Sequence, residues 1–86
     1  MEIEDVKKII ETEYDCTEEG LDWQERKYVF KKATDNVFDF NVNQVVLPDV
    51  DSLFLNFDTL FLFGEGETTL GEVPREAIEN LEIIKK

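Results

Sequence analysis

The apolar segment 53–63, LFLNFDTLFLF, constrains the fold of this 86-residue chain more than any other stretch. Eight of its eleven residues are Leu or Phe, and both ends carry apolar residues at odd and even positions alike. A strand with one face in water alternates apolar and polar residues, whereas a strand covered on both faces does not. Asn56 and Asp58 place a polar notch in the middle of the run. We expect sheet core here, in a central strand covered by a helix on one side; the pattern leaves open whether 53–63 is one strand or two.

Two segments at the ends of the chain have the period of an amphipathic helix. Residues 3–14 carry apolar side chains at a spacing of 3.6 residues, and acids occupy the first turn, where the helix dipole favours negative charge. Gly20 follows as a stop or turn residue. Residues 75–86 repeat the helical spacing after Pro74, which suits a first helical turn, with apolar residues at Ala77, Ile78, Leu81 and Ile84.

The segments between these two helices favour strands. Residues 37–46 alternate, the stretch 33–36 (ATDN) has turn chemistry, and 23–32 contains Tyr28, Val29 and Phe30, so we expect a hairpin of 23–32 with 37–46. The alternation slips near Gln44, where a bulge is expected, and a short strand is expected at 69–73. The predicted fold class is α+β: one domain, 1–86, with a small antiparallel β-meander of three to four strands flanked by an N-terminal and a C-terminal helix.

Composition places the chain among folded, cytoplasmic proteins. It is 42% hydrophobic and 12% aromatic, which is too apolar for a disordered acidic tail. Cys16 is the one cysteine, so no internal disulfide can form and a reducing compartment is expected. The N-terminal MEIEDVKKII lacks the basic region and apolar run of a signal peptide, and no segment reaches the ~20 apolar residues of a membrane span.

Few residues in the chain suit catalysis or metal binding. There is no His, and the single cysteine has no histidine partner for a nucleophilic or zinc site. GEGETT at 64–69 matches neither a dinucleotide fingerprint nor a phosphate loop, and DVDSLF at 49–54 begins like a calcium loop but lacks its Gly and Glu. We therefore expect no catalytic, cofactor or metal site, and a protein that is not an enzyme.

The distribution of charge is the main functional signal. The net charge is −12; residues 26–32 hold four bases, while residues 33–74 hold eight acids and no Lys or Arg. Such a balance argues against direct binding to nucleic acid or to anionic membrane, because both need a basic surface. We interpret the four bases of 26–32 as partners for the acids of the N-terminal helix, which lowers the repulsion between like charges within the chain. The expected partner is a protein with a basic surface, such as a nucleic-acid-binding protein.

Two acidic groups are the candidate partner-binding residues. Trp23 lies inside the first group and is either an aromatic anchor at an interface or a core residue. The second group lies in predicted loops, where Asp35 adds a further acid. The predicted site consists of Glu11, Glu13, Asp15, Glu18, Glu19, Asp22, Trp23 and Glu25, together with Asp49, Asp51, Glu65 and Glu67.

Carboxylates spaced on a rigid surface can present charge as a phosphate backbone does. In size and charge the chain is similar to small acidic inhibitors, including uracil-DNA glycosylase inhibitors, barstar-like nuclease inhibitors and some anti-CRISPR proteins. The leading hypothesis is therefore a phage-encoded inhibitor, of the anti-CRISPR or anti-restriction type, that mimics nucleic-acid charge and blocks a nucleic-acid-binding enzyme. The alternatives are a structural or assembly subunit, including a homodimer, an antitoxin or immunity protein for a basic toxin, and an acidic face that serves solubility alone.

Overall fold

The structure is a computed structural model that describes residues 2–17 and 27–86. It is an α+β fold with one helix of seven or more residues in that part of the chain, α1 (Ile3–Glu13), and eight strands in two antiparallel sheets. The five-stranded sheet has the order β1 (Tyr14–Cys16), β2 (Lys27–Lys32), β5 (Ser52–Asn56), β6 (Thr59–Phe63), β7 (Thr69–Pro74). The three-stranded sheet has the order β4 (Val45–Leu47), β3 (Phe38–Val42), β8 (Leu81–Lys85).

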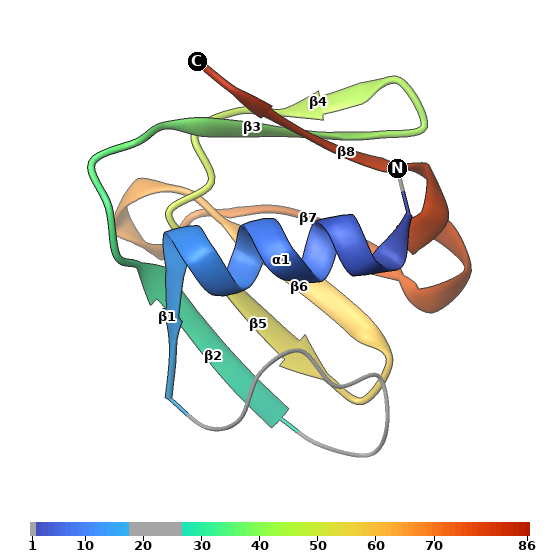
Figure 1. The fold of residues 1–86 in the computed structure, drawn as a ribbon, viewed down its shortest axis with the longest axis horizontal. Helices are drawn as coiled ribbons and strands as arrows, with labels where there is room; N and C mark the ends of the chain where they lie inside the picture. The colour runs from blue at the N-terminus through green and yellow to red at the C-terminus, as the bar shows by residue number, and fades with distance from the viewer. Residues whose placement is uncertain (1, 18–26) are drawn as a thin grey trace.

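The predicted N-terminal helix is present as α1. Val6 and Ile10 are buried, and Glu4 and Asp5 lie in the first turn, as the period and the dipole require. The helix ends where Tyr14 becomes extended and begins β1, and Gly20 lies outside the described residues. In Figure 1, α1 crosses the five-stranded sheet, and the three-stranded sheet lies along one side of the helix. None of the helices described is long and apolar enough to cross a membrane.

The apolar segment 53–63 forms two strands, β5 and β6, which answers the question that the sequence left open. The hairpin turns at Phe57 and Asp58, and Phe57 takes a positive φ of 59°. A two-residue turn reverses the odd–even pattern, because side chains on facing strands share a face when they are paired in register. The pairs Leu53–Leu62 and Leu55–Leu60 therefore both point into the core. Because of this turn, the buried residues occupy odd positions in β5 and even positions in β6. Read as one strand, the segment therefore resembles a strand that is covered on both faces.

The predicted pairing of 23–32 with 37–46 is also wrong. β2 pairs with β1 and β5, whereas β3 lies in the other sheet between β4 and β8. Residues 33–36, which were expected to form the hairpin turn, instead lie in the connection between the two sheets. The slip near Gln44 is a tight β3–β4 turn rather than a bulge, with φ of 49° at Asn43 and 69° at Gln44, as in a type I′ hairpin.

The predicted C-terminal helix is wrong, whereas the predicted strand at 69–73 is confirmed as β7. Residues Arg75–Asn80 form a 3₁₀ helix, η2, and Leu81–Lys85 form β8, which pairs with β3. Leu81 and Ile83 are buried while Glu82 and Ile84 are exposed, which is the period of a strand. Ala77, Ile78 and Leu81, three of the four positions with helical spacing, are also buried in the observed η2 and β8. The pattern of apolar residues alone therefore could not distinguish a helix from this structure.

One cluster of buried side chains joins α1, η2 and both sheets. Two cross-strand rows form its floor: the first is Tyr28, Leu55, Leu60 and Val73, and the second is Phe30, Leu53 and Leu62. Tyr14 links the layers, because its ring packs edge-on against Phe40 and its hydroxyl donates a 2.6 Å hydrogen bond to the Val50 carbonyl. Since one face of the five-stranded sheet is used in this core, the opposite face is available to form a surface.

Candidate protein-binding surfaces

The outer face of the five-stranded sheet carries an apolar centre between two charged flanks. Val29, Phe54 and Phe61 lie in one cross-strand row, Phe63 lies in the next, and all four are half-buried. The rings of Phe54 and Phe61 stack at a tilt, with centroids 6.2 Å apart. We refer to this surface as the outer sheet face. Its side chains, in strand order, are Asp15, Lys27, Val29, Lys31, Ser52, Phe54, Asn56, Thr59, Phe61, Phe63, Thr69, Glu72 and Pro74.

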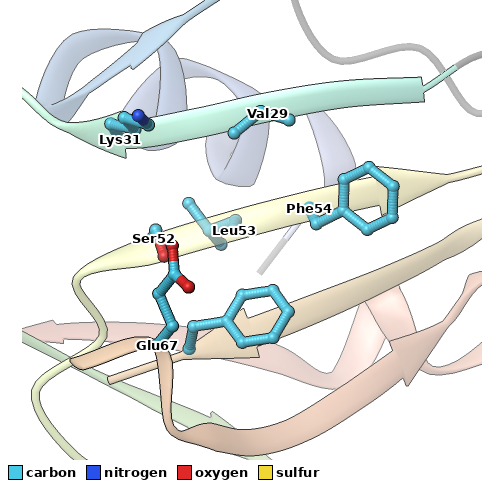
Figure 2. Close-up of a pocket in the computed structure, with 7 residues that line it drawn as sticks. Val29, Lys31, Ser52, Leu53, Phe54 and Glu67 are labelled. Atoms are coloured by element: carbon cyan, nitrogen blue, oxygen red, sulfur yellow. The ribbon is translucent and has the colours of Figure 1, made fainter. Parts of the chain in front are cut away.

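A cavity of about 300 Å³ opens on the outer sheet face. Its lining combines apolar side chains with one base and one acid: Val29, Lys31, Ser52, Leu53, Phe54, Phe63 and Glu67. Figure 2 shows Glu67 reaching across the cavity toward Ser52, with Lys31 on the neighbouring strand. A small, largely apolar hollow with opposite charges at its rim suits a side chain from another protein surface.

Glu13 of the predicted site has a structural role. Its carboxylate accepts hydrogen bonds from the Thr34 hydroxyl and from the Asn36 side-chain amide, which lie in the link between the two sheets. These hydrogen bonds, Thr34 first, and the charge of Lys85 hold the pKa of Glu13 below its ordinary value. Glu13 therefore ties the end of α1 to the 34–36 segment, and its carboxylate is already occupied.

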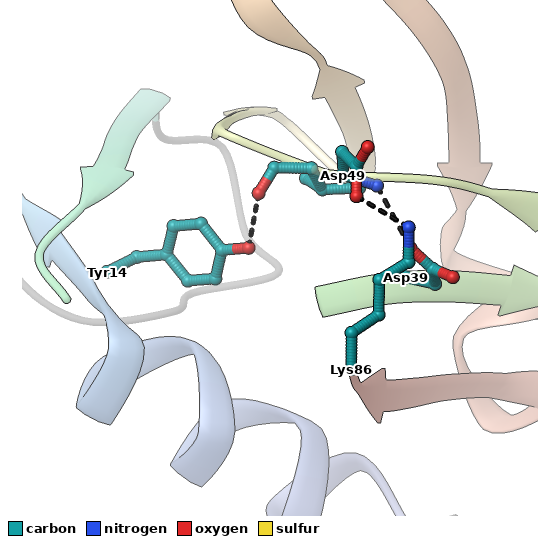
Figure 3. Close-up of polar contacts among 5 residues, drawn as sticks. Tyr14, Asp39, Asp49 and Lys86 are labelled. Atoms are coloured by element: carbon teal, nitrogen blue, oxygen red, sulfur yellow. Dashed lines mark hydrogen bonds and ion pairs between the residues drawn. The ribbon is translucent and has the colours of Figure 1, made fainter. Parts of the chain in front are cut away.

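Asp49 is also occupied. Lys86 places its Nζ 2.7 Å from Asp49 Oδ1 and 3.2 Å from Asp39 Oδ1, and the backbone N–H of Asp49 donates to Asp39 Oδ1 at 3.0 Å. Figure 3 shows Lys86 lying between the two carboxylates, which raise the pKa of its ammonium group. This ion-paired cluster joins the end of the chain to the loop before β5.

Three acids of the predicted loop group lie around one shallow depression. It has a volume of about 420 Å³ and is lined by Asp49, Asp51 and Glu65, with Lys32 at the same rim. The carboxylates of Asp51 and Glu65 have no hydrogen-bond or ion-pair partner among the residues described. Residues far apart in sequence are thus brought together by the ends of β2, β5 and β6. We call Asp49, Asp51 and Glu65 the acidic rim.

The remaining predicted residues are scattered. Glu67 lies at the cavity of the outer sheet face, Asp15 lies on the same face opposite Lys31, and Glu11 is on the exposed side of α1. Five predicted residues lie outside the described part of the chain: Glu18, Glu19, Asp22, Trp23 and Glu25. The structure therefore joins three of the loop acids into one surface and separates the helix acids from them. No group of three or more acids or cysteines able to hold a metal ion is found within residues 2–17 and 27–86.

Sequence reasoning missed the outer sheet face. Phe54, Phe61 and Phe63 were assigned to sheet core because the turn at Phe57 and Asp58 was hidden inside the apolar run. One signal was present, since the polar residues Asn56, Asp58 and Thr59 lie at the turn between β5 and β6. No protein-family model, no curated protein and no solved structure matches this chain.

Proposed function

We propose that this protein is a non-enzymatic binding domain that docks an acidic surface onto a basic protein, such as the nucleic-acid groove of an enzyme. One observation carries the proposal: the acidic rim gathers Asp49 and Asp51 of the β4–β5 link and Glu65 of the segment after β6 around a single depression. Like charges so placed repel one another, so an arrangement of this kind favours a cationic partner that neutralises them.

The electrostatics of the rim support contact with a base-rich surface. The carboxylates of Asp51 and Glu65 have no hydrogen-bond or ion-pair partner among the residues described, whereas Asp49 is ion-paired with Lys86, and Lys32 lines the same depression. Strand ends hold their backbone in place, so the carboxylates are spaced on a rigid support, as phosphates are along a nucleic-acid strand. A partner evolved to bind phosphates would meet similar charge. An inhibitor encoded by a phage fits this proposal, and an antitoxin or immunity protein would use the same electrostatics.

The test is capture on the immobilised protein from a lysate of the cells in which the protein is produced. Elution with a salt gradient, and separately with excess duplex DNA, should release the same nucleic-acid-binding protein. Salt screens the attraction between the charges, and DNA competes for the basic groove. The double variant Asp51→Asn/Glu65→Gln should elute at lower salt. Its matched control, Glu76→Gln/Glu79→Gln, removes the same charge from η2 and should elute as the wild type does.

Two results would reject this proposal. The first is recovery of a partner that duplex DNA does not displace. The second is an identical elution position for the Asp51→Asn/Glu65→Gln variant and the wild type, which would leave the acidic rim without a role in binding.

A further inference from the structure

The outer sheet face has opposite charges on its two flanks. Lys27 and Lys31, both exposed, lie on β2 at one flank, and among the residues described Asp15 adds one acid beyond them on β1. Glu67 and Glu72, both exposed, lie at the β6–β7 flank. The apolar centre lies between these flanks, so the face is basic on one side, apolar in the middle and acidic on the other.

A face with this order of charges is complementary to itself. Consider a second copy related by a two-fold axis that runs parallel to the strands and between β5 and β6. This rotation places each β2 over the other copy's β7, so the basic flank of each copy meets the acidic flank of the other. A two-fold axis perpendicular to the strands would instead place the two basic flanks together, which like charges disfavour.

We propose that the outer sheet face binds a second copy of this chain, with the two sheets face to face about an axis parallel to the strands. In that arrangement Phe54 of each copy lies over Phe61 of the other, and Phe63 lies over Ser52, whose small side chain lines the cavity. Glu72 lies over Val29, with Lys27 and Lys31 two residues away on either side.

The size of the face sets the strength of the dimer. Strands about 4.8 Å apart and residues about 3.4 Å apart give it a span of roughly 20 Å by 17 Å. The area of such a face is well below the ~800 Å² that each partner buries in a stable complex, so the dimer is weak and transient. We expect a dissociation constant on the order of 100 µM. The net charge of −12 on each copy also opposes association.

Sedimentation equilibrium of the whole chain, from about 10 µM to about 1 mM at one ionic strength, tests the proposal. The wild type should pass from monomer to dimer across this range. Lys27→Glu/Lys31→Glu should raise the dissociation constant about ten-fold, because it creates like-charge contacts at both flanks. Glu67→Lys/Glu72→Lys should raise it similarly. An equimolar mixture of the two variants should form a heterodimer as readily as the wild type forms its homodimer.

Matched controls separate this geometry from a simple effect of net charge. Glu76→Lys/Glu79→Lys changes the charge as Glu67→Lys/Glu72→Lys does, but on η2, and should leave dimerisation intact or strengthen it. Lys7→Glu/Lys8→Glu on α1 is the control for the lysine variant. Far-ultraviolet circular dichroism of each variant confirms that it is folded.

Three outcomes would overturn the proposal: a wild type that stays monomeric up to about 1 mM, a Glu67→Lys/Glu72→Lys variant that dimerises more strongly than the wild type, or a mixture that does not recover association. The proposed binding of a basic partner is separable from this one. The Asp51→Asn/Glu65→Gln variant should still dimerise, and the Lys27→Glu/Lys31→Glu variant should still bind that partner.

Discussion

Replacing Tyr14 by Phe removes one hydroxyl and keeps the ring that packs on Phe40. Tyr14 is 2% exposed, and its hydroxyl donates to the carbonyl of Val50, 36 residues away. This is the hydrogen bond by which the junction of α1 and β1 holds the segment just before β5. The change therefore isolates one long-range polar contact in a core that is built mainly from apolar side chains.

The expected loss follows from the burial of both partners. A buried hydrogen bond contributes about 1 kcal/mol, and an acceptor left unpaired in the core costs about 1–3 kcal/mol. We expect Tyr14→Phe to lower the free energy of unfolding by about 2 kcal/mol at neutral pH. For a domain of this size, with a stability of about 5 kcal/mol, that is a large fraction of the total.

The pH dependence gives an independent check. Burial, together with the carboxylates of Asp51 and Glu13, raises the pKa of the Tyr14 hydroxyl in the folded protein. A raised pKa means that the unfolded chain loses this proton first as the pH rises. The contribution is complete below about pH 10 and then falls by about 1.4 kcal/mol per pH unit. The phenylalanine variant lacks this dependence.

Urea denaturation followed by circular dichroism, at about pH 7 and again between about pH 9.5 and 11, measures both effects. The stability difference between wild type and variant should be largest at neutral pH and should shrink as the solution becomes alkaline. Two results would refute the reasoning: a difference below about 0.5 kcal/mol at neutral pH, or a difference that does not change across the alkaline range.

Two further predictions concern the link between the two sheets and the β3–β4 turn. Glu13→Gln should lower stability at neutral pH. Because the pKa of Glu13 lies below its ordinary value of 4.5, this difference should narrow as the pH falls through that value, and a pH-independent difference in urea denaturation would contradict the account. Gln44→Gly should stabilise the protein, because Gln44 holds a φ of 69° that costs a non-glycine residue about 1 kcal/mol. Differential scanning calorimetry should show a melting temperature about 4–8 °C higher, and a lower one would count against the turn geometry.

Local patterns determined part of the fold. The 3.6-residue period of 3–14 predicted α1, because a helix is stabilised by the residues it contains and by one apolar side. Alternation predicted one strand over 37–46, which the structure divides into β3 and β4, and the short strand predicted at 69–73 is β7. The excess of acids and the long stretch without bases are properties of composition, so they also needed no structure.

Tertiary structure decided which strands pair and which face each one buries. Alternation shows that a strand has one apolar side but not which strand lies beside it, so β2 and β3 were wrongly joined when they belong to different sheets. In 75–86, Ala77, Ile78 and Leu81 have the spacing of a buried helix side, yet they are equally buried in the observed succession of η2 and β8. Pairing with β3 resolved the choice, because each backbone hydrogen bond in a ladder needs a partner from elsewhere in the chain.

The same division holds for the candidate surfaces. The sequence predicted Asp49, Asp51 and Glu65 as exposed acids; Asp49 and Glu65 are exposed and Asp51 is half-buried. Only the fold brings them around one depression and binds Asp49 to Lys86. The outer sheet face was not predicted from the sequence because one two-residue turn reverses which residues of 53–63 face the core. Local charge and hydrophobic period are set by residues close in the chain. A surface is formed by strands that pair side by side, and which strands pair depends on the packing of the whole core.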